Sequence, residues 1–508
     1  MNKIHRFALY TLLSLSFAAP AMAQTKGPSS SQTPYLLPAA PGVSLTSILT
    51  VGDSVNNKTD GTPYRMVGIP DGLGAFDNND GTFTLLMNHE LSGTSGVPRA
   101  HGAKGAFVSK WIIDKTTLQV KNGSDLTQKV KLWDGSGFTD AAATFARFCA
   151  GELAPVSAFF NNISGLGTTE RIYLNGEESG TEGRAFAHIA TGAEAGTSYQ
   201  LPYLGKFSWE NAVASPATSD KTIVAGLDDT TGGQVYLYIG NKQNTGNEIE
   251  KAGLQNGKLF GVSVASLTAE SDATKLMPGT RFSLADLGNV ANKTGAQLNS
   301  DSVSAGVTSF LRPEDGAWDP SNPRDFYFNT TNNYNGPSRL WRLRFDDIAN
   351  PETGGIIEAV LDGTEGQKML DNMTIDRYGH ILLQEDVGNN TRLGKVWQYD
   401  IATDTLTELA QHDPSRFLTG GANFLTQDEE SSGIIDAQDI LGPGWFLLDV
   451  QAHYGLGGEL VEGGQLLALY NPSTYQAYSA SVPESSNTKA ITALSFLMLG
   501  MGIYQRRR

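Results

Sequence analysis

The sequence has one cysteine, few basic residues and no long segment of helical periodicity. Cys149 is the only cysteine among 508 residues, which excludes an intramolecular disulfide. Lysine and arginine number 37 against 53 acidic residues, giving a formal net charge of -16, and no basic run precedes the last three residues. This composition argues against a nucleic-acid partner and favours cations as partners.

Short apolar or alternating runs take the place of a helical pattern, and they are separated by clusters of Gly, Asn, Asp and Pro. This arrangement predicts an all-β fold. Six of the runs end in acidic or amide residues, at 82–87, 171–174, 222–227, 325–328, 380–384 and 445–448. We interpret these six as the innermost strands of a six-bladed β-propeller, so that their polar ends meet in one pocket. The terminal strands are expected to pair and close the ring.

The start of the chain has the composition of a targeting segment. Residues 1–23 have a basic start, an apolar run over residues 7–17 and Ala-Met-Ala before Gln24. This pattern is typical of a secretory signal peptide, so the protein is expected to be exported. Residues 24–481 are predicted to form a single propeller domain, and the protein is expected to be monomeric.

The end of the chain carries a second address. Residues 482–508 combine Val-Pro-Glu-Ser, an apolar stretch over residues 490–504 and three terminal arginines. This tail resembles the PEP-CTERM sorting signals that an exosortase processes in Gram-negative bacteria. It implies periplasmic transit, an outer-surface or extracellular-matrix location and association with exopolysaccharide. A single-pass membrane anchor is the alternative, although the stretch is short for a span of about 20 residues.

Cys149 lies between a basic and an acidic residue, Arg147 and Glu152. A lone cysteine in an exported protein is a buried spectator, an intermolecular link or a reactive thiolate. A thiolate that binds a metal is protected from oxidation and adds negative charge to a cationic cluster. Cys149 is therefore a candidate metal ligand.

A second group of candidates lies in residues 312–316, which read Arg-Pro-Glu-Asp-Gly. Proline biases the preceding residue towards an extended conformation, so Arg312 and Glu314 are expected to point the same way. One site would then hold a guanidinium for phosphate beside a carboxylate for a metal. A surface Arg–Glu pair in a turn is the alternative interpretation.

Adjacent acidic residues follow three of the six runs, and they are Glu177–Glu178, Asp228–Asp229 and Glu385–Asp386. Neighbours on a strand point to opposite faces, so one member of each pair at most is expected at a single site. Clustered carboxylates repel one another and need a hard cation such as calcium. His89 and Glu90 end another run, where His89 is either a site residue or a structural histidine.

The sequence lacks a Gly-x-Ser-x-Gly elbow, a His-Glu-x-x-His helix and a phosphate-binding Gly-x4-Gly-Lys loop. A serine hydrolase, a classical zinc hydrolase and a P-loop enzyme are therefore disfavoured.

Three segments together resemble the PhoX-type alkaline phosphatases: Arg-Phe-Cys at 147–149, Tyr-Leu-Asn-Gly-Glu-Glu at 173–178 and Arg-Pro-Glu-Asp-Gly at 312–316. The similarity extends to Asp371-Asn372 and Glu385-Asp386. The resemblance implies a six-bladed propeller that holds iron and calcium near its axis and hydrolyses phosphate monoesters, so its partner would be a small phosphate ester.

The resemblance also implies roles for individual residues. Cys149 corresponds to an iron-binding thiolate, and Arg312 to the catalytic residue that clamps phosphate. Carboxylate metal ligands are implied at Glu178, Glu177, Glu210, Glu314, Asp228, Glu90 and Glu385.

The chain departs from that family in its signal peptide, which has no Arg-Arg pair of the twin-arginine type. Two other functions stay open at this point. One is a non-catalytic, calcium-stabilised propeller of the cell surface or exopolysaccharide matrix. The other is a phytase-like phosphatase that uses calcium alone and would make Cys149 incidental.

Overall fold

The computed structural model describes residues 23–474, which are mostly in β-strands, so the all-β prediction is confirmed. Apart from Ala23, the predicted signal peptide lies outside the described residues, and so does the predicted sorting signal at 482–508. The helices are short: α1 (Val156–Phe159), α2 (Glu248–Lys251), α3 (Gly295–Ser304), α4 (Pro414–Phe417) and α5 (Gln438–Leu441). None of the helices within residues 23–474 is long and apolar enough to span a membrane.

The strands form four larger sheets and three two-stranded ribbons. In the order of hydrogen-bonded neighbours, the first sheet is β1 (Ala23–Lys26), β3 (Ser44–Thr50), β35 (Val461–Tyr470), β34 (Trp445–Gly457) and β33 (Glu429–Asp436). The second is β11 (Phe138–Ala141), β10 (Lys129–Trp133), β17 (Thr197–Gln200), β16 (Ala185–Ile189), β15 (Ile172–Glu177), β12 (Phe148–Leu153), β6 (Pro70–Asp77), β7 (Thr82–His89), β8 (Phe107–Asp114) and β9 (Val120–Asp125).

The third sheet is β18 (Trp209–Ala214), β19 (Lys221–Asp228), β21 (Val235–Asn241), β22 (Lys258–Ser263), β23 (Arg281–Gly288), β28 (Gly355–Leu361), β27 (Arg339–Phe345), β26 (Asp325–Thr330) and β25 (Pro313–Trp318). The fourth is β2 (Leu36–Pro38), β32 (Thr405–His412), β31 (Lys395–Asp400), β30 (His380–Glu385) and β29 (Leu370–Ile375). The ribbons are β4 (Ser54–Asn57) with β5 (Pro63–Arg65), β13 (Phe160–Asn161) with β14 (Leu166–Gly167), and β20 (Thr231–Gly233) with β24 (Phe310–Leu311).

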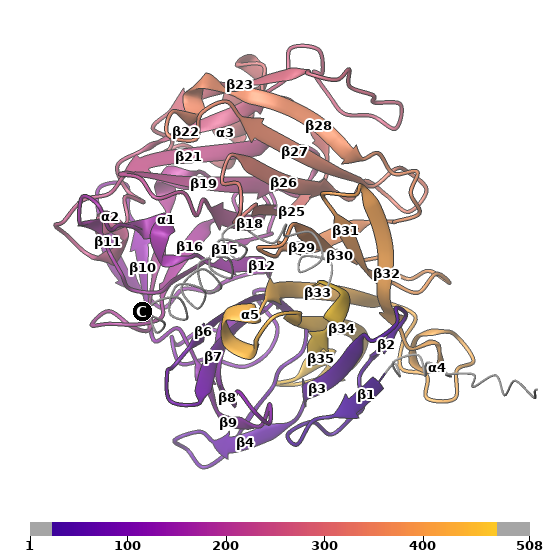
Figure 1. Cartoon of the computed structure of the whole chain (residues 1–508). Coiled ribbons are helices and arrows are strands. Elements are labelled where there is room, and N and C mark those ends of the chain that lie inside the picture. The colour runs from indigo at the N-terminus through magenta and orange to yellow at the C-terminus, as the bar shows by residue number, and fades with distance from the viewer. Residues whose placement is uncertain (1–22, 475–508) are drawn as a thin grey trace, which may run out of the picture.

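The larger sheets are built from groups of consecutive antiparallel strands. In each group one strand lies near the centre of the molecule, and the other strands follow it outwards (Figure 1). These inner strands contact one another in the cyclic order β6, β12, β18, β25, β29 and β33, and β33 contacts β6 again. The sheets are thus arranged around a common axis.

The runs that we interpreted as innermost strands are instead the second strands, β7, β15, β19, β26, β30 and β34, so this prediction is wrong in its detail. The reason is burial. A second strand is covered on both faces by neighbouring sheets, which selects a continuous apolar run. The inner strands border the axis and carry Gly, Asn and acidic residues, which conceal them in the sequence.

The two ends of the described chain meet in the first sheet, as predicted. Strand β3 pairs antiparallel with β35, from Ser44 opposite Tyr470 to Thr50 opposite Gln465. The side chain of Gln465 also donates to the backbone oxygen of Thr33 and accepts from the backbone nitrogen of Tyr35. The ring of sheets is therefore closed by strands from opposite ends of the sequence.

Every inner strand departs from regular pairing, five of them near the start and β33 at its middle. The register shifts between Phe148 and Gly151 on β12, Trp209 and Ala212 on β18, Pro313 and Gly316 on β25, and Leu370 and Met373 on β29. Shifts also occur between Asp71 and Leu73 on β6 and between Ser432 and Ile434 on β33. An extra residue in a strand bends it and redirects its side chains, which is why such bulges accompany functional sites.

Candidate metal centre

The second residue of each inner strand bears a carboxylate or a thiol. These residues are Asp71, Cys149, Glu210, Glu314, Asp371 and Glu430. All six side chains are buried, and Glu210 is wholly inaccessible to solvent. Equivalent positions on six strands around one axis therefore bring metal-ligating groups to one end of the axis.

Residues from the ends of the second strands complete the arrangement. Four groups of three residues have ligand atoms that all lie within 4.8 Å of one another. The groups are Asp71–Glu90–Cys149, Cys149–Glu178–Glu210, Glu210–Asp229–Glu314 and Asp371–Asp386–Glu430. Cys149 and Glu210 each belong to two groups, so three of the four form a continuous chain of potential ligands.

The electrostatics of this centre favour neutral side chains unless a cation is bound. Burial raises the pKa of Asp71, Glu210 and Glu314 well above the usual carboxyl range, and the neighbouring carboxylates raise each pKa further. Burial also raises the pKa of the Cys149 thiol, with Asp71 and Glu210 adding to the effect. Crowded acidic groups of this kind ionise together only when protons are replaced by metal ions.

Three buried ligand atoms make no hydrogen bond within the described residues. They are Glu210 Oε2, Asp371 Oδ1 and Glu314 Oε1, and only Glu314 Oε1 has an ion-pair partner, Arg312 Nη2 at 2.9 Å. A buried acceptor without a partner is costly, and a cation would satisfy it. The donor set combines carboxylate oxygens, which suit calcium, with one thiol, which suits iron, so these residues fit a centre that contains both metals.

Cys149 lies at the junction of two groups. Its Sγ is 3.3 Å from Asp71 Oδ2, and its backbone oxygen accepts a hydrogen bond from Asn88 Nδ2 at 2.7 Å. The amide of Asn372 donates to Asp71 Oδ1 at 3.2 Å from across the axis. Amide side chains thus fix both the backbone around the thiol and the carboxylate beside it.

Arg312 contacts the same carboxylates, but its backbone is not extended. Its φ is 60°, in the left-handed region, so the prediction of an extended residue before Pro313 is wrong. The backbone nitrogen of Thr331, just after the end of β26, donates to the Arg312 oxygen at 3.1 Å, and such tertiary contacts hold the residue against its local preference. The Arg312 guanidinium reaches Asp229 from Nε and Nη2 at 2.8 Å each, and its Nη2 lies 2.9 Å from Glu314.

A second arginine lies at this end of the axis. Arg147 also has a left-handed backbone, with φ of 50°, and its side chain is about half exposed. Its Nη2 lies 2.7 Å from Glu90 Oε1 and also contacts Glu178. Arg147 and Arg312 therefore both present guanidinium groups next to the buried carboxylates.

Of the residues for which the resemblance implies a role, Cys149, Glu90, Glu178, Glu210 and Glu314 lie in three linked groups of potential ligands. The structure does not place Glu177, Asp228 or Glu385 in any of the four groups.

The three excluded residues bond elsewhere. Glu177 pairs with Arg184 at 2.6 Å, and Glu385 pairs with Arg392 at 2.6 Å. Asp228 accepts a hydrogen bond from Thr230. In each adjacent pair the other member, namely Glu178, Asp229 or Asp386, joins the centre, which agrees with the expected alternation of side chains along a strand. His89 is buried, stacks on Phe107 and contacts Ser109 through Nε2 at 2.9 Å, as a structural histidine does.

Sequence reasoning missed Asp71 and Glu430 altogether. Both lie on inner strands without an apolar run, so nothing in the periodicity identified them. A signal was nevertheless present, because an acidic residue followed by Asn, Asp, Ser or Gly before an apolar residue recurs on the inner strands. Examples are Asp-Gly-Leu at 71–73, Glu-Asn-Ala at 210–212 and Asp-Asn-Met at 371–373.

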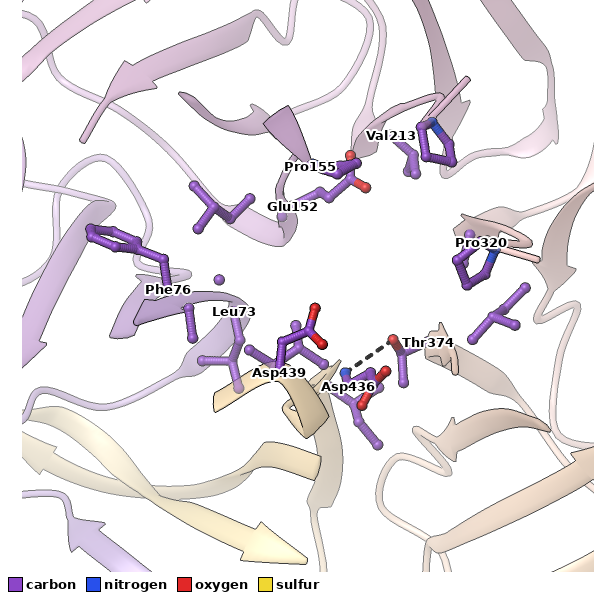
Figure 2. A pocket seen from close by; sticks show the side chains of 18 of the residues that line it. Leu73, Phe76, Glu152, Pro155, Val213, Pro320, Thr374, Asp436 and Asp439 are labelled. Atoms are coloured by element: carbon purple, nitrogen blue, oxygen red, sulfur yellow. Dashed lines mark hydrogen bonds between the residues drawn. The ribbon is translucent and has the colours of Figure 1, made fainter. Parts of the chain in front are cut away.

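A cavity of about 910 Å³ lies at the opposite end of the inner strands, which we call the cavity end. Figure 2 shows Leu73, Val213 and Glu152 around this space, with Asp436 near Thr374. The backbone nitrogen of Asp436 donates to Thr374 Oγ1 at 3.3 Å. None of the four potential ligand groups belongs to this end.

Comparisons with known proteins bear mainly on the fold. A sequence profile of the family described as alkaline phosphatase PhoX matches residues 192–360, which is less than half of the chain. A comparison with curated protein sequences gave no significant match. Pseudomonas fluorescens PhoX in complex with vanadate, a transition state analogue, matches with a TM-score of 0.62 at 13% identity, over 86% of this chain and 98% of that chain. This chain therefore shares the propeller-like fold of that protein.

Two other solved structures are much less similar. The PQQ-bound aldose sugar dehydrogenase of Streptomyces coelicolor has a TM-score of 0.33 at 12% identity, over 85% of this chain and 99% of that chain. Trypanosoma rangeli sialidase in complex with the inhibitor DANA has a TM-score of 0.38 at 12% identity, over 87% of this chain and 62% of that chain. Similarity at this level carries no argument about function.

Proposed function

We propose that the protein is an exported, metal-dependent phosphatase that hydrolyses phosphate monoesters. The observation that carries the proposal is the ring of buried carboxylates and one thiol at a single end of the inner strands, with Arg312 beside it. The partial match to the alkaline phosphatase PhoX family and the likeness to a PhoX structure that binds vanadate support it. We also infer that each inner strand starts one blade of a six-bladed propeller.

The chain supplies the ligands for the metals. Cys149, Glu178 and Glu210 would hold iron, while Glu210, Asp229 and Glu314 would hold calcium, and Asp371, Asp386 and Glu430 would hold a further calcium. Such cations, when bound, neutralise phosphate charge and lower the pKa of water. The chain itself contributes binding and orientation of the substrate.

Arg312 is suited to bind the phosphoryl group. Asp229 and Glu314 hold its Nε and Nη2 groups, and within residues 23–474 its Nη1 has no hydrogen-bond partner. The side chain is 32% exposed, so this nitrogen remains available to donate to phosphoryl oxygens. A guanidinium fixed in advance stabilises the charge of the transferring group without reorganisation during the reaction.

Release of inorganic phosphate from phenyl phosphate tests the proposal. Purified protein should release phosphate, should lose this activity on chelation and should regain it when iron and calcium are returned together. Bis-phenyl phosphate, a diester, is the control and should be hydrolysed poorly. Absence of phosphate release by metal-loaded protein would reject the phosphatase and leave the calcium-stabilised propeller. Full recovery with calcium alone would favour the phytase-like alternative.

A further inference from the structure

A separate cavity of about 380 Å³ lies beside Arg312. Its lining includes Arg312, Asp272, Asn332, Asn333 and Thr231. Nearly all of these side chains are polar. Since Arg312 touches both this cavity and the proposed metal ligand Glu314, a phosphate ester bound at Arg312 would direct its alcohol part towards this space.

Several hydrogen bonds hold Asn332 in the wall of the cavity. This residue has a left-handed backbone, with φ of 60°, and its nitrogen donates to the Leu311 oxygen at 3.0 Å. Its side-chain Nδ2 donates to Asp272 Oδ1 at 2.9 Å and to the Pro337 oxygen at 3.2 Å, and its Oδ1 accepts from Asn333 at 2.8 Å. The amide of Asn332 therefore fixes the position of the Asp272 carboxylate.

Some charged side chains around the cavity have ion-pair partners and one does not. Glu270 accepts from Arg339 Nη1 at 2.5 Å, from the Leu311 nitrogen at 2.8 Å and from Thr330 Oγ1 at 3.1 Å, so both its oxygens are used. Arg339 donates to the backbone oxygen of Asp272 rather than to its carboxylate. Within the described part of the chain, Asp272 makes no salt bridge. Arg312, in contrast, forms ion pairs with two carboxylates, Asp229 and Glu314.

We propose that this cavity holds the alcohol part of the phosphate monoester, and that Asp272 makes it prefer an alcohol bearing an ammonium group to one bearing a carboxylate. This inference rests on the proposed function and names the substrate class of the same site. A carboxylate in the cavity wall that has no ion-pair partner attracts a cationic group and repels an anionic one. This electrostatic effect weakens as the salt concentration rises.

The test compares kcat/KM for phosphoethanolamine with kcat/KM for 3-phosphoglycerate, using metal-loaded protein and phenyl phosphate as the uncharged reference. The wild-type protein should prefer phosphoethanolamine. Asp272→Asn should lower the ratio of the two values by about fivefold, since one charge is removed near the surface. Asp272→Lys should lower the ratio further. The matched control is Asp286→Asn, which removes an exposed carboxylate paired with Lys258 outside the cavity and should leave the ratio unchanged.

The outcomes separate this inference from the proposed function. A failure of the wild-type protein to hydrolyse any of the three esters would overturn both. Hydrolysis of all three with the same ratio in wild type, Asp272→Asn and Asp272→Lys would overturn the substrate preference alone. A fall in the ratio that is equally large for Asp286→Asn would show a general effect of net charge and would also overturn it.

Discussion

Both ends of the inner strands contain buried acidic residues, but the two ends differ in the hydrogen-bond donors that these carboxylates have. At the ligand end, where the four groups of potential metal ligands lie, Asp71 lies close to Glu90, and Glu210 lies close to Asp229 and Glu314. Glu210 also keeps an oxygen without a hydrogen-bond partner. At the cavity end, Asp315 accepts from Asn211 Nδ2 at 2.6 Å and from the Met373 nitrogen at 3.0 Å, and Glu152 accepts from the Ala214 nitrogen at 2.7 Å. Each carboxylate there has its own donors.

This difference shows that acidic residues alone do not define a metal site. Burial raises the pKa of Glu152 to about 8 and that of Asp315 to about 6. At neutral pH Glu152 is therefore mostly protonated, whereas Asp315 is mostly ionised and is stabilised by its hydrogen bonds. Crowding at the ligand end leaves the carboxylates repelling one another, which only several protons or cations can relieve. Variants at the two ends test whether function belongs to one of them.

The largest effect is expected from Cys149→Ala at the ligand end. Removal of the thiol should lower bound iron and reduce phosphatase activity by about 100-fold or more, because a centre with fewer ligands stabilises less charge. Metal analysis and phosphate release on the same sample measure both quantities. Glu152→Gln at the cavity end is the matched control and should change neither. Normal iron in the Cys149 variant would show the thiol to be a spectator.

A smaller effect is expected from Arg312→Lys, which keeps the charge but cannot contact Asp229 through two nitrogens and also reach Glu314. We expect kcat/KM to fall by about tenfold or more while metal content stays the same. Glu314→Gln is the contrasting variant and should lose metal first, because an amide is a poorer ligand for a hard cation. Equal metal loss in both variants would reject this division of roles.

Stability should respond to the close packing of β6 against β12. A Cβ at Gly72 would lie 2.3 Å from the Gly151 nitrogen and 2.6 Å from the Ala150 carbonyl carbon. Gly72→Ala should therefore cost about 1–3 kcal/mol of unfolding free energy, measured by denaturant titration. Gly137 has nothing within 4 Å of an added Cβ, so Gly137→Ala should change stability by less than about 0.5 kcal/mol. Similar costs at both positions would contradict the packing.

The sequence predicts the strands that are buried on both faces better than the strands that border the axis. The all-β class followed from the second strands, which are buried on both faces and so are continuously apolar. The same reasoning mistook them for inner strands, because strands that border a polar axis have no apolar run. Alternation along a strand predicted that at most one residue of each acidic pair reaches the centre, but not which one. The contact of Asn372 with Asp71 joins residues 301 positions apart, and no local pattern encodes it.

The smallest effect on metal content and activity is expected from Glu152→Gln at the cavity end, which should change stability alone. The folded-state pKa of Glu152, about 8, lies above the usual value of 4.5, so its contribution to stability is present at low pH and is lost as pH rises towards 8. Glu152→Gln retains an oxygen for the Ala214 nitrogen and removes this loss. The variant should be more stable than wild type by up to about 4 kcal/mol at pH 8 and equal to it at pH 4. Thermal melts of both proteins at each pH compare their stabilities. A gain in stability at pH 4 but not at pH 8 would contradict a raised pKa of Glu152 in the folded state.

Elemental analysis of the purified protein tests the central claim, which is that the ligand end of the inner strands binds metals. The account predicts iron and calcium in the wild-type protein, their loss in Glu210→Gln and their retention in Glu152→Gln, with phosphate release following the metal content. Wild-type protein free of both metals after exposure to them, or equal metal content in the two variants, would contradict it.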